Sequence, residues 1–260
     1  MQRKKIKNIL NKKAKVPIIC LTAYSKPIAE ILDKYCDIIL VGDSVGMVLY
    51  GMKTTKEIKF ETMINHAKAV KSNSKKSLVV FDMPYKTYSN KFTAYNNAKK
   101  VIQLTKCDAV KLEGGKKIIE IVKYLTNRGI PVMGHIGLLP QSSTKFKLKG
   151  KNFGERIKIL EDAVALSNSG VFAIVIECVV ESLAKKITKT VNVPTIGIGA
   201  SKYCDGQILV TDDIIGLSSF RPRFVKQYSN IKKIIEKSVK KYSNDIKNKK
   251  FPSTKNVYKF

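Results

Sequence analysis

A repeating alternation of short apolar runs and longer amphipathic stretches constrains the fold of this chain more than any other feature of its sequence. The apolar runs are rich in Ile and Val, and they lie at residues 17–22, 37–41, 78–81, 109–112, 131–134, 173–176, 194–198 and, more weakly, 208–210. Near-continuous apolarity over so few residues is typical of strands that are buried on both faces, as in a parallel sheet.

The stretches between these runs predict helices. Helical patterns lie at about 26–35, 57–72, 91–105, 116–127, 154–169, 180–190 and 227–248. Strands that alternate with helices in this way predict an α/β fold, a (β/α)8 TIM barrel. The 260 residues of the chain also fit one such barrel, which takes roughly 250 residues.

No linker divides the chain, so we expect one barrel domain over residues 1–260. The basic N-terminal segment 1–15 contains seven basic and no acidic side chains. The C-terminal tail 247–260 is expected to be exposed or to form an arm on a neighbouring subunit. We expect the basic ends to be dispensable for chemistry, so removal of residues 2–12 should leave kcat within a few-fold of its value.

The net charge of +29 raises the question of a nucleic-acid partner. Only 5 of the 49 basic residues are Arg, the residue that carries most bidentate recognition of bases and phosphates. Much of the excess charge lies at the two ends. We therefore interpret it as a solvated, lysine-rich surface and expect no nucleic-acid partner. A basic RNA-binding protein remains the alternative from another functional class.

Other features of the composition concern the cellular location. No apolar run approaches the roughly 18 residues that a membrane helix needs, so we expect no membrane partner. The five cysteines are odd in number and never closely paired, which argues against a disulfide framework and a structural zinc site. The N-terminus lacks a small-residue cleavage site for a signal peptide. A cytoplasmic location is the simplest expectation.

The barrel prediction identifies candidate functional residues, because chemistry in such barrels takes place at the carboxyl ends of the strands. The polar residues that end or follow the apolar runs are Asp43 with Ser44, Asp82, Lys111 with Glu113, His135 and Glu177. Any single acid there could be a helix N-cap. Capping is a poor explanation for four acids that end four buried strands.

Three of these acids predict a metal site. Asp43, Asp82 and Glu113 would form a set of oxygen ligands without thiolates or paired imidazoles. This composition suits Mg²⁺, which takes one or two carboxylates and leaves positions for water and substrate oxygens. The alternative is that the aspartates only form turns.

The remaining candidates predict substrate binding and proton transfer. Lys111 and Glu113 are two residues apart, so on a strand both point to one face, here into the barrel mouth. Lys111 would neutralise a substrate carboxylate, unless it forms only a surface ion pair. Glu177 follows four apolar residues, and a poorly solvated pocket there would suit a general base. The alternative is a buried structural glutamate paired with a lysine. His135 is a candidate polar contact, although a lone histidine is more often structural.

Seven motifs, in this order, carry a resemblance to a known family. They are Val-Gly-Asp-Ser (41–44), Asp-Met-Pro (82–84), Lys-Leu-Glu-Gly-Gly (111–115), Gly-His-Ile-Gly-Leu-Leu-Pro-Gln-Ser (134–142), Ile-Glu-Cys-Val (176–179), Gly-Ile-Gly-Ala (197–200) and Asp-Gly-Gln-Ile-Leu-Val (205–210). Over roughly residues 15–228 the chain resembles the ketopantoate hydroxymethyltransferase family.

The resemblance implies a barrel of the phosphoenolpyruvate/pyruvate type and a one-carbon transfer. A hydroxymethyl group would pass from 5,10-methylenetetrahydrofolate to 3-methyl-2-oxobutanoate, giving 2-dehydropantoate (ketopantoate) for pantothenate and coenzyme A biosynthesis. The partners would be the keto acid, the folate and further copies of the chain, in a homo-oligomer that is a decamer in bacterial members. The alternative among enzymes is a lyase or mutase of the same barrel type.

The resemblance also implies a role for each candidate residue. One Mg²⁺ per subunit would be held by Asp43 and Asp82, with Glu113 as the third acid. Substrate-binding groups would be Asp43, Ser44, Asp82 and Lys111, of which Ser44 and Lys111 would hold the keto-acid carboxylate. Glu177 would be the catalytic proton acceptor.

The chain departs from the family pattern outside these residues. The segment 144–152 is shorter and richer in lysine than is usual, Ser201 replaces a common Gly, and Val180 replaces a Pro. Asp212 stands where a His is usual. These differences concern loop mobility and folate affinity, and not the metal centre.

Overall fold

In the computed structural model, the described residues are 2–143, 147–218 and 222–258. They form two compact units, residues 1–210 and 211–260. The first contains the barrel. The second contains the helices α9 (Thr211–Ile214) and α10 (Ile231–Lys247) and a short 3-10 helix.

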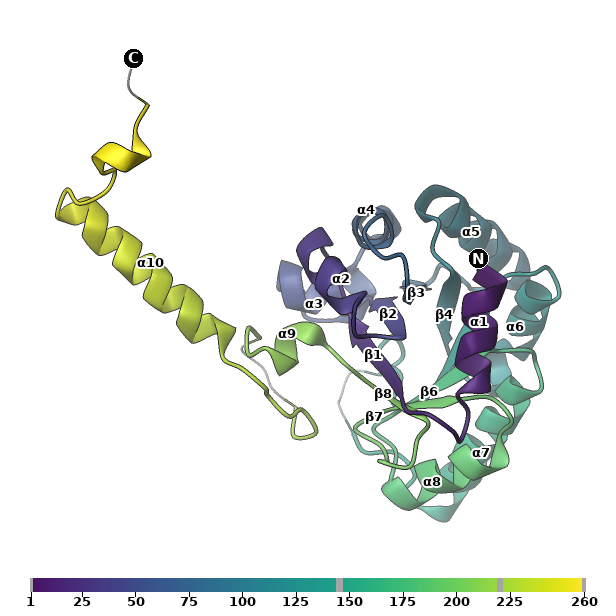
Figure 1. Cartoon of the computed structure of the whole chain (residues 1–260). Coiled ribbons are helices and arrows are strands. Elements are labelled where there is room, and N and C mark those ends of the chain that lie inside the picture. The colour runs from purple at the N-terminus through teal and green to yellow at the C-terminus, as the bar shows by residue number, and fades with distance from the viewer. Residues whose placement is uncertain (1, 144–146, 219–221, 259–260) are drawn as a thin grey trace. The chain divides into compact units, whose positions relative to one another are not determined.

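In the described part of the chain, eight parallel strands form a closed barrel (Figure 1). They are β1 (Ile18–Thr22), β2 (Ile38–Val41), β3 (Leu78–Asp82), β4 (Ala109–Glu113), β5 (Val132–Gly137), β6 (Ala173–Glu177), β7 (Thr195–Ile198) and β8 (Gly206–Leu209). Each strand pairs with the next, and β8 pairs with β1, where Ile18 lies opposite Gly206. The predicted (β/α)8 barrel is confirmed.

In the described part of the first unit, one α-helix precedes β1, and the other α-helices lie between strands along the chain. They are α1 (Gln2–Asn11), α2 (Lys26–Leu32), α3 (Val45–Tyr50), α4 (Phe60–Lys71), α5 (Lys91–Thr105), α6 (Ile119–Thr126), α7 (Phe153–Ser167) and α8 (Glu181–Thr190). The sequence pattern predicted most of these, but neither α1 nor α3.

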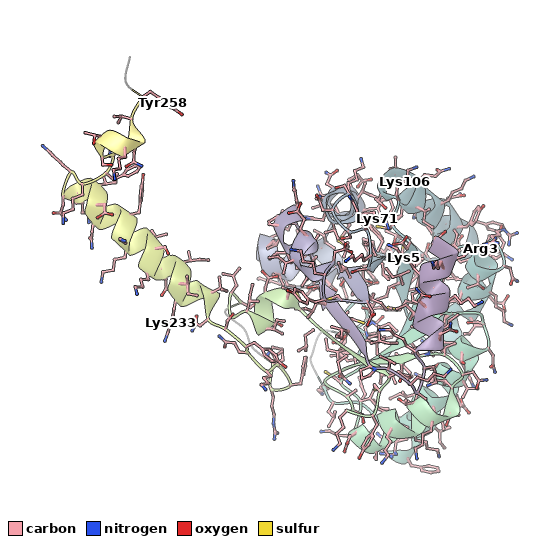
Figure 2. All side chains as sticks on the ribbon, in the orientation of Figure 1. Arg3, Lys5, Lys71, Lys106, Lys233 and Tyr258 are labelled. Carbon is pink, nitrogen blue, oxygen red and sulfur yellow. The ribbon has the colours of Figure 1, made fainter. Side chains whose placement is uncertain are left out.

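The second unit is rich in lysine. The residues of α10 are all at least partly exposed, and its lysine side chains, such as Lys233, extend from the ribbon (Figure 2). The predicted tail, residues 247–260, contains the 3-10 helix Thr254–Asn256. Its packing on a neighbouring subunit stays a prediction.

The interior of the barrel is filled by alternate strand residues. In β3, Leu78 and Val80 belong to an inner apolar cluster, whereas Val79 and Phe81 belong to the larger cluster that contains residues of the surrounding helices. Because side chains on a strand alternate between its two faces, the residue after Phe81, Asp82, shares the inner face. The same alternation therefore determines which polar side chains face the barrel mouth.

Helix α1 gives the basic N-terminal segment a structural role. The side chain of Ile9 is 3% exposed and belongs to the inner cluster of the barrel. The Gln2 amide donates a hydrogen bond to the carbonyl of Asp108 at 2.6 Å, and the Lys5 ammonium donates one to the carbonyl of Ser77 at 2.7 Å. Both carbonyls precede strands, so α1 lies at the amino ends of the strands, opposite the predicted site. The effect of removing residues 2–12 on kcat stays a prediction, but their removal would uncover part of the core.

We expect Ile9→Ala to lower the free energy of unfolding by about 2–5 kcal/mol, because the substitution leaves a cavity in the inner cluster. Leu10→Ala is the matched control: Leu10 is 38% exposed, and its truncation should cost about 0.5 kcal/mol or less. Urea unfolding curves measure both values. Equal effects of the two substitutions would contradict the role assigned to α1.

Candidate active site

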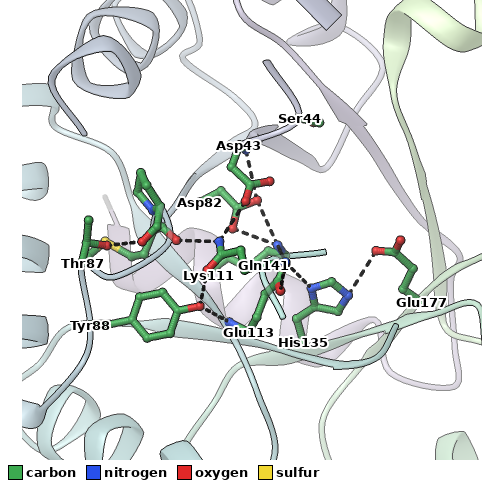
Figure 3. A network of polar contacts seen from close by, with 12 residues as sticks. Asp43, Ser44, Asp82, Thr87, Tyr88, Lys111, Glu113, His135, Gln141 and Glu177 are labelled. Carbon is green, nitrogen blue, oxygen red and sulfur yellow. Dashed lines mark hydrogen bonds and ion pairs between the residues drawn. The ribbon is translucent and has the colours of Figure 1, made fainter. Parts of the chain in front are cut away.

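Buried polar side chains from five consecutive strands meet at the carboxyl end of the barrel (Figure 3). They are Asp43, which follows β2, Asp82 in β3, Lys111 and Glu113 in β4, His135 in β5 and Glu177 in β6. Their exposed fractions range from 1% for His135 to 8% for Glu177. The structure thus brings together the acids, the lysine and the histidine that the sequence predicted.

Lys111 and Asp82 form a buried ion pair. The two residues lie opposite each other on β3 and β4, and the Lys111 ammonium donates to the two Asp82 carboxylate oxygens at 2.8 and 2.9 Å. Burial alone would lower the pKa of Lys111, but the carboxylates of Asp82, Glu113 and Asp43 outweigh it and raise that pKa above its usual range. Lys111 is therefore a fixed cation in the site.

Asp43 lies beside Asp82, and this places two acids next to each other. The backbone N–H of Asp43 donates to an Asp82 oxygen at 3.3 Å. Burial and then the charge of Asp82 raise the pKa of the Asp43 carboxyl, although Lys111 acts in the opposite direction. This crowding of negative charge is what a bound cation would relieve.

Ser44 lies at the start of helix α3, directly after Asp43. It is half-buried, and its hydroxyl forms a hydrogen bond of 2.8 Å with the Tyr24 hydroxyl. Ser44 thus follows an acid of the site directly in the chain, and its role in holding the keto-acid carboxylate stays a prediction.

His135 lies between two glutamates on the other side of the site. Its Nδ1 is 3.5 Å from Glu113 Oε1, and its Nε2 is 3.2 Å from Glu177 Oε2. Neither ring nitrogen makes a hydrogen bond of good geometry within the described residues, so these are charge contacts in a buried site. No partner of Glu177 was evident from the sequence; in the structure its partner is His135.

The protonation states of His135 and Glu113 depend on each other. Burial and Lys111 would lower the pKa of His135, but the two glutamates outweigh them and raise it to about 9. Burial would raise the pKa of Glu113, but His135 and Lys111 hold it below its usual range. At neutral pH His135 is therefore protonated and Glu113 is ionised.

Sequence reasoning missed two residues of the site, Gln141 and Tyr88. Gln141 follows β5, is 2% exposed, and donates to an Asp43 oxygen at 2.8 Å. The Tyr88 hydroxyl, from the segment between β3 and α5, donates to the Gln141 carbonyl oxygen. Gln141 lies in a motif of the resemblance, which could have drawn attention to it, whereas no local pattern marks Tyr88.

The donor set fits a divalent cation in composition and charge. In the geometry of the described residues, no three His, Cys, Asp or Glu side chains lie close enough together to hold a metal ion. Mg²⁺ needs only one or two carboxylates, however, and Asp43 and Asp82 supply them. Glu113 is less free, because its oxygens face the Gln141 N–H and His135. The site contains four acids and only two basic side chains, Lys111 and His135, and this excess of acids favours a cation.

The shortened lysine-rich segment 144–152 is only partly described, since 144–146 lie outside the described residues. The rest of the segment is bound to the chain after β6. The Lys149 N–H donates to the carbonyl of Cys178 at 2.8 Å, and the Val180 N–H donates to the carbonyl of Lys149 at 2.9 Å. Lys149 therefore lies against the residues that follow Glu177.

Two further observations concern the chain as a whole. Asp212 lies in α9 of the second unit. Across the described residues, none of the helices is long and apolar enough to cross a membrane.

Sequence comparison identifies close relatives. Residues 3–254 match the family described as ketopantoate hydroxymethyltransferase. A 3-methyl-2-oxobutanoate hydroxymethyltransferase from Pelagibacter ubique is 58% identical over 255 residues, which cover 98% of this chain and 99% of the relative. An enzyme of the same name from Rhizobium etli is 50% identical over 248 residues, which cover 94% and 91% of the two chains.

Solved structures with the same fold are more distant in sequence. Phosphonopyruvate hydrolase, in complex with oxalate and Mg²⁺, superposes with a TM-score of 0.63 at 10% identity, covering 97% of this chain and 93% of that one. A 2,3-dimethylmalate lyase of the PEP mutase/isocitrate lyase superfamily gives 0.62 at 10% identity, covering 98% and 88%. These structures show the fold alone, and they share the barrel fold of this chain.

Proposed function

This chain belongs to the ketopantoate hydroxymethyltransferase family, and we propose that its barrel mouth transfers a hydroxymethyl group to 3-methyl-2-oxobutanoate to give 2-dehydropantoate. The one-carbon donor would be 5,10-methylenetetrahydrofolate, and the product would enter pantothenate biosynthesis. A homo-oligomer, which the resemblance implies, is part of the same proposal. So is a cytoplasmic location, which fits the five free cysteines.

One observation carries the proposal: the buried charges form two groups with different chemistry. On one side the Lys111 ammonium lies 2.8 Å from Asp82, next to Asp43. On the other side His135 joins Glu113 to Glu177. The first group suits the binding of a keto acid through its oxygens, and the second suits the transfer of a proton.

In the first group, Asp43 and Asp82 would hold Mg²⁺, with Glu113 as the third acid nearby. The ion supplies Lewis-acid polarisation of the keto-acid oxygens when it is bound. The Lys111 ammonium would attract the substrate carboxylate as a compact cation, and the Ser44 hydroxyl would donate a hydrogen bond to it. Burial excludes water, which strengthens each of these electrostatic contacts.

In the second group, Glu177 would accept the proton from C3 of the keto acid, so that this carbon can attack the one-carbon unit. His135 contacts Glu177 Oε2. The other oxygen, Oε1, makes no hydrogen bond or ion pair with the described residues, and it would receive the proton. His135 would keep the carboxylate oriented toward the substrate.

A lyase or mutase reaction is the weaker alternative. The solved lyase and hydrolase structures share 10% identity with this chain, whereas the hydroxymethyltransferases share 58% and 50%. An RNA-binding function is not favoured by any contact at the site.

Proton exchange tests the proposal. We expect the protein and Mg²⁺ in D₂O to remove the NMR signal of the C3 proton of 3-methyl-2-oxobutanoate, because the proton acceptor acts before the transfer. Addition of 5,10-methylenetetrahydrofolate should then give 2-dehydropantoate, and a chelator should stop both reactions. A protein that catalyses neither reaction would contradict the proposal.

A further inference from the structure

Gln141 connects acids from two strands without belonging to either strand. Its side chain donates one hydrogen bond to Asp43 Oδ2 at 2.8 Å and another to the carbonyl of Met83 at 2.9 Å. Its backbone N–H donates to Glu113 Oε2 at 3.0 Å. One buried residue thus contacts two of the three acids assigned to the metal and the backbone next to the third, Asp82.

Tyr88 determines the orientation of the Gln141 amide. The Tyr88 hydroxyl donates to the Gln141 carbonyl oxygen at 2.5 Å and accepts the backbone N–H of Glu113 at 3.3 Å. A flipped amide would point its oxygen at the Asp43 carboxylate and at the Met83 carbonyl, and oxygen would then face oxygen in both contacts. The Tyr88 hydroxyl, the Asp43 carboxylate and the Met83 carbonyl therefore all favour the same orientation of the Gln141 amide.

Gln141 and Tyr88 are both uncharged, so they do not repel a cation that binds at the site. Lys111 already neutralises one acid of the site, Asp82, through a two-point ion pair. Gln141 holds Asp43 without adding positive charge, so the charge of Asp43 stays available to a cation. Only Asp43 Oδ2 is used by Gln141, and Oδ1 makes no side-chain hydrogen bond to the described residues.

We propose that Gln141 and Tyr88 act as one positioning unit that fixes the carboxylates of Asp43 and Glu113 for the divalent cation. The inference rests on the proposed metal site. Groups that orient metal ligands typically contribute 10–100-fold to metal affinity, because they fix ligands that would otherwise have to be ordered when the ion binds.

The test measures Mg²⁺ binding by calorimetry, with thermal unfolding as a check on the fold. Gln141→Met keeps the length of the side chain and removes the amide, and we expect it to weaken Mg²⁺ binding by roughly 10–100-fold. Tyr88→Phe removes only the hydroxyl and should weaken binding by about 10-fold or less. At saturating Mg²⁺ both variants should recover most of kcat, since neither residue contacts the reacting atoms.

A double variant separates a positioning unit from two independent structural contacts. If Tyr88 acts through Gln141, the double variant should bind Mg²⁺ about as weakly as Gln141→Met alone. Tyr95→Phe is the control, because Tyr95 is also half-buried, and its hydroxyl makes no hydrogen bond to the described residues. It should bind Mg²⁺ as the wild type does.

The outcomes distinguish this inference from the proposed function. A wild type that binds no Mg²⁺ would overturn the metal site itself. A wild type that binds Mg²⁺, with both single variants folded and equal to it in affinity, would overturn only the positioning unit, as would additive losses in the double variant. If Gln141→Met does not fold, Tyr88→Phe alone decides, because the loss of one hydroxyl leaves the packing of the ring unchanged.

Discussion

Replacement of Asp82 by asparagine is expected to abolish Mg²⁺-dependent activity while the barrel stays folded. A neutral amide cannot replace a carboxylate on a hard cation, and it also removes the charge that faces the Lys111 ammonium at 2.8 Å. Both the metal ion and the substrate-binding Lys111 lose the Asp82 carboxylate. Activity assays over a range of Mg²⁺ concentrations, with calorimetry of Mg²⁺ binding, measure the effect.

Asp108→Asn is the matched control for this prediction. Asp108 is 5% exposed and also forms an ion pair with a lysine, Lys71, but it lies at the amino end of β4, away from the site. Its replacement should lower stability and leave the Mg²⁺ requirement unchanged. Wild-type activity of Asp82→Asn at modest Mg²⁺ would contradict the assignment of Asp82 as a ligand.

The sequence predicted the site residues on β3 to β6 because their placement depends on strand geometry. Lys111 and Glu113 are two residues apart, and a strand places them on one face whatever their neighbours are. Asp82 and Glu177 end apolar runs, and the carboxyl ends of parallel strands meet at one end of a barrel. These inferences need the strand boundaries and nothing else.

The contacts between strands could not be predicted in the same way. His135 meets both Glu113 and Glu177 because β5 pairs with β4 and β6 in a particular register. The sequence of one strand contains no information about that register. The contact of Tyr88 with Gln141 depends on two loops, whose conformations follow no short-range period.

Composition also concealed the role of the N-terminal segment. Its lysines suggested a solvated end, but Ile9 belongs to the inner core cluster. In a helix with so many charged residues, a single buried apolar residue, Ile9, is a weak signal. The lysines of this helix are therefore no guide to whether its apolar side packs into the core.

Glu177→Gln is expected to slow exchange of the C3 proton of the keto acid by roughly 10²–10⁴-fold, the usual loss for a positioned base. Glutamine keeps the size of the side chain and removes its basicity, and it also removes the charge that faces His135 at 3.2 Å. Asp43, Asp82 and Lys111 are unchanged, so binding of Mg²⁺ and of the keto acid should persist. NMR exchange rates and calorimetry measure the two properties separately.

Glu181→Gln is the control for this prediction, because Glu181 is an exposed acid at the start of α8, four residues further along the chain. It should exchange the proton at the wild-type rate. If Glu177→Gln also kept that rate, the proton acceptor would be another group. His135 would be the next residue to test, but it is a poor base because its pKa of about 9 keeps it protonated at neutral pH. Loss of Mg²⁺ binding in Glu177→Gln would instead make Glu177 a metal ligand, so the two measurements together assign its role.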